Sequence, residues 1–299
     1  MDANLILSLA DRRAVLDVAG GKGASLARLA QADLPVPAGF HITTRAYRLF
    51  VEVNELQPAI ERALVGVDAS DPAALEQVSQ EIADLFASAL IPDEIGGAVQ
   101  RAYAGLPGAA PAVAVRSSAT AEDLPQASFA GQQETYLNVS GAEAVLAAVR
   151  RCWASLWTAR AIGYRARQGI ESAHVALAVV IQTLVPAEAA GILFTANPLT
   201  GDREQVLINA AWGLGEAIVS GAVTPDTILV NKASGAVIER QVGEKCSQTV
   251  QIGGGTAEQP VPESLRMAPV LDDAQAAELA RLGQQIEALY KTPMDIEWA

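Results

Sequence analysis

Residues 113–139 read VAVRSSATAEDLPQASFAGQQETYLNV, a segment that joins an apolar run, one arginine, several hydroxyl side chains and a glycine loop. The apolar run predicts a short buried strand that carries Arg116 to an edge, where its guanidinium can bind phosphate oxygens through two hydrogen bonds. Gly131 lies in a loop whose backbone N–H groups can approach an anion closely. Taken alone, the segment is equally consistent with two strands that are joined by an acidic turn and carry a structural arginine.

Around this segment, the periodicity of apolar residues predicts a mixture of helices and strands. Apolar residues three and four positions apart predict helices around residues 44–64 and 72–90, and a long helix over 142–168. In the second half of the chain, apolar runs separated by Gly, Pro, Asn and Asp predict strands. The 299 residues exceed the usual domain size of roughly 100 to 200 residues. We therefore expect an α+β fold with two lobes, residues 1–181 and the sheet-rich residues 182–299.

The composition excludes some classes of partner. The formal net charge is −13, whereas a surface for nucleic acid or an anionic membrane needs a basic patch. Nucleic acids and membranes are therefore not expected partners. Cys152 and Cys246 fit no CxxC spacing and are expected to be buried, reduced thiols. We recognise no signal peptide and no apolar run long enough for a membrane helix, so we expect a cytoplasmic location.

Together with residues 113–139, six further motifs resemble the N-terminal nucleotide-binding domain of the phosphoenolpyruvate synthase, pyruvate phosphate dikinase and rifamycin phosphotransferase family, in its order. They are DVAGGKGASLARL (17–29), LPVPAGFHITTRAY (34–47), CWASLWTARAIGYR (152–165), VVIQTLVPAEAAGILFTANPLTG (179–201), AAWGLGEAIVSGAVTPDTILV (210–230) and MDIEWA (294–299). The resemblance covers essentially the whole chain. It implies a two-lobed ATP-grasp-like domain with ATP as substrate and Mg²⁺ as cofactor.

The GGKG segment at residues 20–23 is not a P-loop. That motif needs a glycine five residues before its second glycine and Ser or Thr after the lysine, and Leu16 and Gly23 occupy these positions. One remaining interpretation is a glycine turn that lets Lys22 reach phosphate as a point charge, and the other is an exposed structural lysine. The family resemblance implies that Lys22 contacts the ATP phosphates.

An apolar run from Val179 leads through Gln182 to Pro186. An adenine ring needs an apolar slot with a few backbone or amide groups that read its edge. The resemblance implies that Gln182 and the backbone near Leu184 and Val185 hold adenine. A buried strand without a ligand is the structural alternative.

The final MDIEWA alternates between acidic and apolar residues. In a strand, Asp295 and Glu297 would point to one face while Ile296 and Trp298 point to the other. Paired carboxylates suit Mg²⁺, which completes its ligands with phosphate and water oxygens. The resemblance implies that Glu297 binds the metal with Asp295 adjacent or supporting, and ordinary strand alternation is the alternative.

Together, these expectations describe the Mg-ATP-binding domain of a dikinase-type phosphotransferase. Lys22 and Arg116 would neutralise the triphosphate, and the loop from Gly131 through Gln132 to Thr135 would cap it. Catalysis would then consist of positioning and charge neutralisation, with no nucleophile from this domain. Phosphoryl would pass from ATP to a carrier histidine. The parent activity that the resemblance favours is phosphoenolpyruvate synthase (pyruvate, water dikinase), with rifamycin phosphotransferase second.

Two departures from the family pattern qualify this expectation. The family domain continues past MDIEWA into a return strand with a glutamine and an arginine, so the domain is expected to be C-terminally truncated and its site incomplete. His41 and His174 are the two histidines, and neither follows the threonine-serine-histidine pattern of a phosphocarrier. The histidine phosphocarrier domain and the acceptor-substrate domain are therefore expected to be separate. A stand-alone nucleotide-binding module without turnover is the alternative.

Overall fold

The computed structural model describes residues 4–120, 134–170 and 175–299. Contacts divide the chain into two compact units, Met1–Leu184 and Val185–Ala299. Helices and strands occur in both units, which confirms the α+β class, while the ATP-grasp-like relation of two lobes stays a prediction. A boundary after residue 181 would cut β5 (Leu177–Thr183), and this strand lies wholly within the first unit.

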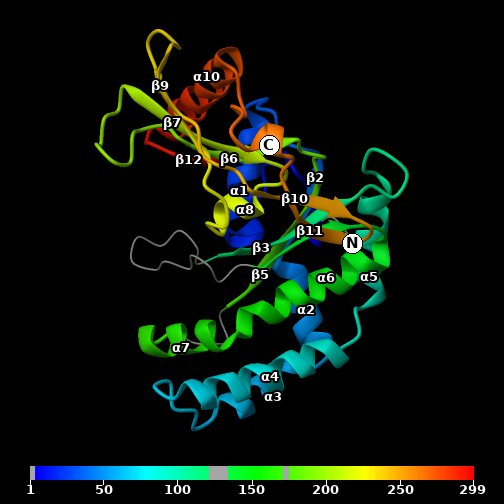
Figure 1. The fold of residues 1–299 in the computed structure, drawn as a ribbon. Helices are drawn as coiled ribbons and strands as arrows, with labels where there is room; N and C mark the ends of the chain where they lie inside the picture. The colour runs from blue at the N-terminus through cyan, green and yellow to red at the C-terminus, as the bar shows by residue number, and fades with distance from the viewer. Residues whose placement is uncertain (1–3, 121–133, 171–174) are drawn as a thin grey trace. The chain divides into compact units, whose positions relative to one another are not determined.

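The first unit contains a sheet of five antiparallel strands in the order β1-β2-β5-β3-β4. Its other strands are β1 (Ile6–Ser8), β2 (Gly39–Ile42), β3 (Val113–Ala119) and β4 (Thr135–Val139). The central strand β5 is buried from Leu177 to Gln182, because helices cover both faces of the sheet (Figure 1). This double burial explains why the strand reads as a nearly continuous apolar run.

One face of this sheet packs on a layer of helices. They are α2 (Thr44–Val53), α3 (Leu56–Leu64), α4 (Pro72–Ser88), α5 (Asp93–Ala104), α6 (Ala142–Ala154), the 3₁₀ turn η2 (Ser155–Trp157) and α7 (Ala159–Gln168). Aromatic rings fill the centre of this core, with the ring centroids of Phe50 and Trp153 4.9 Å apart. Close packing of aromatic rings adds to the stabilisation from apolar burial.

Two of the predicted helices are broken in the structure. Glu55 adopts a left-handed conformation with φ of 52° and separates α2 from α3 within the helix expected over 44–64. The long helix expected over 142–168 is interrupted at η2, and Thr158 starts α7 by accepting a hydrogen bond from the Ala161 N–H. A threonine N-cap of this kind favours a new helix start over continuation of the previous one.

The opposite face of the sheet packs on α1 (Leu16–Gln31). Leu7 from β1 and Ala19 and Ala27 from α1 belong to a small apolar cluster there. The helix already includes the GGKG segment, and it is kinked at Gly20. The glycine turn therefore lies within α1 and not before it.

The second unit contains a sheet of five antiparallel strands in the order β12-β6-β7-β8-β9 and a separate hairpin. The strands of the sheet are β6 (Ala189–Phe194), β7 (Gln205–Trp212), β8 (Asp226–Asn231), β9 (Val237–Gln241) and β12 (Asp295–Trp298); the hairpin is β10 (Ser247–Ile252) and β11 (Gly255–Pro260). The helices are α8 (Glu216–Val219), α9 (Glu263–Arg266) and α10 (Asp273–Tyr290). α10 begins at a capping box and packs on one face of the sheet.

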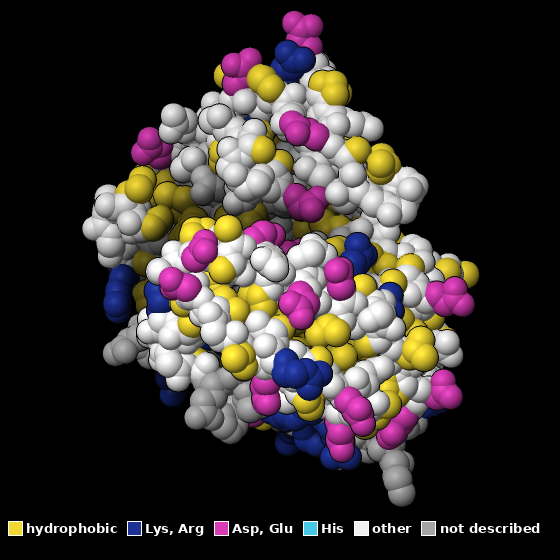
Figure 2. Space-filling view, turned by 90° about the horizontal axis from the view of Figure 1, so that it is seen from below, with side chains coloured by type: hydrophobic (Ala, Val, Ile, Leu, Met, Phe, Trp, Pro, Cys, Tyr) yellow, Lys and Arg dark blue, Asp and Glu magenta, His cyan; other side chains and the backbone are white. Residues whose placement is uncertain are grey.

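The exposed surface has the mixed character expected of an acidic chain. Asp and Glu side chains are scattered over the face in Figure 2, among hydrophobic side chains of which several adjoin one another. Within the described residues, no helix combines the length and the apolar character that crossing a membrane would need.

Candidate functional site

One transverse row of the first unit's sheet contains two of the candidate residues. The register pairs Arg116 with Thr135 on β4 and with Val180 on β5. Val180 is paired in turn with His41, and His41 with Leu7. Directly opposed residues of antiparallel strands project from the same face, so these five side chains share one face of the sheet. Arg116 is half-buried and Thr135 is exposed.

Gln182 lies on the same face, in the next row. It is paired with Ala114 on β3 and with Gly39 on β2, and Ala114 is two residues before Arg116. Gln182 is 8% exposed, and its amide donates a hydrogen bond to the Pro37 carbonyl oxygen 3.5 Å away. The sheet therefore brings the candidate phosphate ligand and the candidate adenine ligand onto one face.

The backbone that follows Gln182 is tied to the start of β3. The N–H of Leu184 donates to the carbonyl oxygen of Ala112 at 2.9 Å. Because this donor already has a partner, the carbonyl group is the part of Leu184 that could read the edge of a base.

Lys22 lies in the turn of α1 that follows the kink at Gly20, and it is half-buried. The hydroxyl of Ser118 on β3 contacts this turn twice. It accepts a hydrogen bond from the Gly23 N–H at 3.0 Å and donates one to the Ala19 carbonyl oxygen at 2.7 Å. Ser118 is two residues after Arg116, so it lies on the same face of the sheet. α1 thus carries Lys22 over the face that holds Arg116.

His41 is completely buried in the same row. Its Nε2 lies 3.1 Å from the Leu9 carbonyl oxygen, and its Nδ1 has no hydrogen-bond partner among the described residues. Burial lowers the pKa of His41 more than the hydrogen bond to Leu9 raises it. The ring is therefore neutral at pH 7 and donates from Nε2 to Leu9, which is a structural contact.

In the second unit, β12 places its two carboxylates on one face. Asp295 and Glu297 are exposed, whereas Ile296 and Trp298 are half-buried and pack against the core beneath α10. The alternation predicted from the sequence is therefore confirmed. Its use for a metal stays a prediction.

Glu297 belongs to a row of mainly polar residues that crosses the second unit's sheet. It is paired with Ile192 on β6, Ile192 with Asn209 on β7, and Asn209 with Thr227 on β8. The Asn209 amide donates to the Thr227 hydroxyl at 3.0 Å, which fixes its orientation. Since Asp295 is two residues away on the same strand, the face offers carboxylate and amide oxygens together.

These oxygens fit the preference of Mg²⁺, which is bound by one or two carboxylates while phosphates and water supply the other ligands. Among the described residues, no group of three or more His, Cys, Asp and Glu side chains is arranged to hold a metal ion. An ion at Glu297 would therefore take most of its ligands from a nucleotide and from water.

The remaining candidates are distributed as follows. Gly131 and Gln132, the predicted phosphate-capping residues, lie outside the described residues, as does His174. Val185 is exposed, and its carbonyl oxygen accepts a hydrogen bond from the Ala187 N–H at 2.8 Å. The first unit contains Lys22, Arg116, Thr135, Gln182 and Leu184, and the second contains Val185, Asp295 and Glu297.

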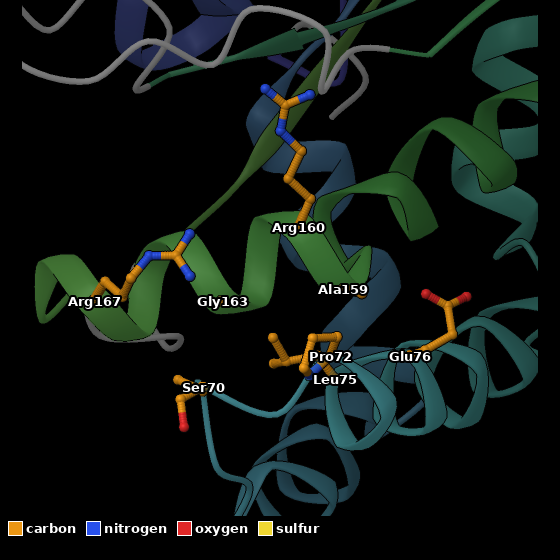
Figure 3. A pocket seen from close by; sticks show the side chains of 9 residues that line it. Ser70, Pro72, Leu75, Glu76, Ala159, Arg160, Gly163 and Arg167 are labelled. Atoms are coloured by element: carbon orange, nitrogen blue, oxygen red, sulfur yellow. The ribbon is translucent and has the colours of Figure 1, made fainter.

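A separate pocket of about 330 Å³ lies between the start of α4 and α7. Its lining is Ala69, Ser70, Pro72, Leu75, Glu76, Ala159, Arg160, Gly163 and Arg167, which includes none of the candidate residues. In Figure 3 the side chain of Arg160 points away from Pro72 and Leu75, and that of Ser70 points away from α7. Because its lining contains none of the candidate residues, the pocket is not part of the candidate site.

Sequence reasoning missed the individual roles of Ser118 and Asn209. Ser118 was one of several hydroxyl residues after Arg116, and nothing local distinguished it. The only local signal for Asn209 is a polar residue inside the apolar run QVLINAAW of β7. A polar amide within an otherwise apolar strand stands out in the sequence, because a buried polar group needs a hydrogen-bond partner.

Comparison with known proteins gives a family match over nearly the whole chain. Residues 16–299 match the family described as pyruvate phosphate dikinase, AMP/ATP-binding domain. A probable phosphoenolpyruvate synthase from Methanothermobacter thermautotrophicus is 47% identical over 286 residues, which cover 94% of this chain and 42% of that protein. A rifampicin phosphotransferase from a Streptomyces species is 47% identical over 303 residues, which cover 100% of this chain and 34% of that protein.

A phosphoenolpyruvate synthase from Pyrococcus furiosus is 43% identical, with 94% of this chain and 40% of that protein covered. The chain therefore spans less than half the length of each of these relatives.

Proposed function

Because this chain belongs to the family of pyruvate phosphate dikinase AMP/ATP-binding domains, we propose that it binds Mg-ATP and donates phosphoryl from ATP to a carrier histidine on a separate domain. The observation that carries this proposal is the common face of the first unit's sheet. Arg116, Thr135 and Gln182 project from that face, and α1 with Lys22 packs on it through Ser118.

The two cations perform complementary tasks in this proposal. Arg116 is half-buried on β3, and its planar guanidinium suits two hydrogen bonds to phosphate oxygens. Lys22 supplies a compact positive charge on a flexible stem. Both lower the cost of bringing a triphosphate to the sheet, and phosphoryl transfer requires mainly such positioning and charge neutralisation.

Other residues would contact the adenine base, the terminal phosphates and the metal ion. Gln182 and the carbonyl of Leu184 would read the edge of adenine, with Val185 of the second unit as a further backbone contact. Thr135 is directly opposite Arg116, so its hydroxyl can contact the same phosphate region, together with Gly131 and Gln132. Glu297 would hold Mg²⁺, supported by Asp295, and the ion when bound would neutralise phosphate charge.

The proposed identity of the final phosphoryl acceptor rests on the relatives. Relatives named phosphoenolpyruvate synthase and rifampicin phosphotransferase are both 47% identical to this chain. We place a pyruvate, water dikinase-type activity first, because SFAGQQETYLNV at residues 128–139 resembles phosphoenolpyruvate synthases. Rifamycin phosphorylation is second, and a nucleotide-binding module without turnover is third.

Calorimetric titration with Mg-ATP tests the proposal. The chain, Lys22→Ala, Arg116→Ala and the control Arg281→Ala are titrated in parallel. Arg281 pairs with Glu278 on an exposed stretch of α10, so its loss removes a positive charge without touching the candidate site. Each site variant should weaken binding by about tenfold or more, equivalent to about 1.4 kcal/mol. A chain that does not bind Mg-ATP, or equal affinities in all four proteins, would exclude the proposed site.

A further inference from the structure

The hydrogen-bond ladder of α1 is opened by a side chain from the sheet. In a regular α-helix the Gly23 N–H would donate to the Ala19 carbonyl oxygen, four residues earlier. Here the Ser118 hydroxyl lies between them, accepting from Gly23 at 3.0 Å and donating to Ala19 at 2.7 Å. Insertion of a side chain into the ladder is a recognised cause of helix kinks.

The kink and the insertion occur where α1 lies in close contact with β3. Gly20 has φ of 70° and ψ of 175°, outside the helical region. A Cβ at Gly20 would lie 2.2 Å from the Ser118 carbonyl oxygen, so no other residue fits without a shift of the backbone. The turn that follows contains Lys22.

We propose that Ser118 is a positioning residue of the nucleotide site. Its two hydrogen bonds, here called the Ser118 bridge, fix the turn that carries Lys22 relative to the strand that carries Arg116. This inference rests on the proposed function, because Lys22 and Arg116 matter together only if both bind the same triphosphate. Ser118 does not touch the nucleotide in this proposal and acts through Lys22.

A hydroxyl suits this position for a chemical reason. The Ser118 bridge needs one donor and one acceptor in a space that is 0% exposed, and a serine hydroxyl supplies both. Without it, Ala19 and Gly23 would either bond each other directly, which would close the ladder and move Lys22, or remain unsatisfied. Both outcomes change the surroundings of the Lys22 amine.

Amine labelling tests the bridge without any nucleotide. Lys22 and the exposed Lys291 are modified by a limiting amine reagent, and the labelled peptides are quantified, with Lys291 as the internal reference. Ser118→Ala should change the relative labelling rate of Lys22 severalfold. Ser118→Cys keeps the space filled while bonding weakly, and should act in the same direction, so it replaces the alanine variant if that fails to fold.

Ser117→Ala is the matched control. Ser117 is equally buried, but its hydroxyl projects from the other face and accepts from the Glu134 N–H at 2.9 Å. The Ser117→Ala variant therefore loses a partly buried hydrogen bond that does not involve α1, and Lys22 labelling should stay at the parent rate. Unchanged labelling in both Ser118 variants, or an equal change in Ser117→Ala, would overturn the proposal.

A double-mutant cycle then links the bridge to Lys22. Ser118→Ala should weaken Mg-ATP binding in the parent chain and have little further effect in Lys22→Ala, because the second substitution removes the group that the bridge positions. Equal losses in both backgrounds would show a general structural effect and refute the proposal. If the parent chain binds no nucleotide, the proposed function fails, and the labelling result still decides whether Ser118 positions Lys22.

Discussion

Asp226 and Lys245 form an ion pair that is completely buried within the second unit, with 2.5 Å between Oδ1 and Nζ. The same carboxylate accepts hydrogen bonds from the Gly243 N–H at 3.0 Å and from the Val270 N–H at 2.8 Å, and Nζ also donates to the Gly243 carbonyl oxygen at 2.7 Å. The pair therefore joins β8 to the loop before β10 and to the segment that leads into α10.

Loss of either Asp226 or Lys245 should destabilise the second unit, because the remaining charge stays buried without its counter-ion. We expect Lys245→Met to lower the free energy of unfolding of the second unit by about 3 to 5 kcal/mol. Chemical denaturation measures this loss. Arg281→Met, which breaks an exposed pair with Glu278, is the control and should change the free energy of unfolding by less than about 1 kcal/mol. Equal effects of the two substitutions would show that the buried pair contributes nothing particular.

Protonation of His41 should destabilise the first unit. Burial lowers its folded-state pKa below the unfolded value, so the unfolded chain binds more protons as pH falls through about 6.5. The stability is fully present above that pH and is lost as pH decreases toward the folded-state pKa, with a slope of at most about 1.4 kcal/mol per pH unit. Denaturation between pH 7 and pH 5 measures the slope.

Two variants separate His41 from other titrating groups. His41→Gln should remove much of this slope. Asp68→Asn should preserve it, because the hydrogen bonds from Ser70 lower the pKa of Asp68 below its usual value and so keep it below the window. A slope that persists unchanged in His41→Gln would assign the pH dependence to other groups.

The alternation of Asp295 and Glu297 could be predicted from the sequence, because a period of two is a local property of one strand. The common face of Arg116 and Gln182 could not be predicted, since it depends on β3 pairing with β5, and these strands are separated by α6 and α7. The Ser118 bridge depends further on the close approach of a helix and a strand. Local pattern and the family resemblance together indicated which residues were candidates, and long-range strand pairing decided which of them share a face.

Gly191 on β6 should be intolerant of a larger side chain. A Cβ there would lie 1.9 Å from the Asn209 carbonyl oxygen and 2.6 Å from the ring of Trp298, its cross-strand partner on β12. Gly191→Ala should lower the free energy of unfolding of the second unit by about 1 to 3 kcal/mol, as expected for overpacking. Gly253→Ala, where nothing lies within 4 Å of the added atom, is the matched control. Similar unfolding midpoints for the two variants would contradict the predicted clash.

The two thiols should differ in reactivity. Cys152 is buried as expected, but the expected burial of Cys246 is wrong, because its side chain is exposed. Burial raises the pKa of the Cys152 thiol well above its usual value. A thiol reagent should therefore modify Cys246 in the native protein and Cys152 only after denaturation. Peptide mapping of the labelled protein checks this, with Cys246→Ser as the control that should abolish native labelling. Rapid native modification of Cys152 would show that the helical core of the first unit opens readily.

Glu297 should determine the metal dependence of nucleotide binding, if it holds Mg²⁺ as proposed. It is exposed on β12, so Glu297→Gln should preserve the fold while removing the charge that attracts the ion. We expect the variant to weaken ATP binding when Mg²⁺ is present and to leave binding with a chelator unchanged.

Asp295→Asn should act in the same direction by a smaller factor, and Glu258→Gln on the β10–β11 hairpin controls for the loss of one exposed acidic charge. Calorimetric titration with and without Mg²⁺ separates the possibilities. A loss of the same size in both conditions would mean that Glu297 acts on the nucleotide directly, whereas unchanged affinity in both would remove it from the site.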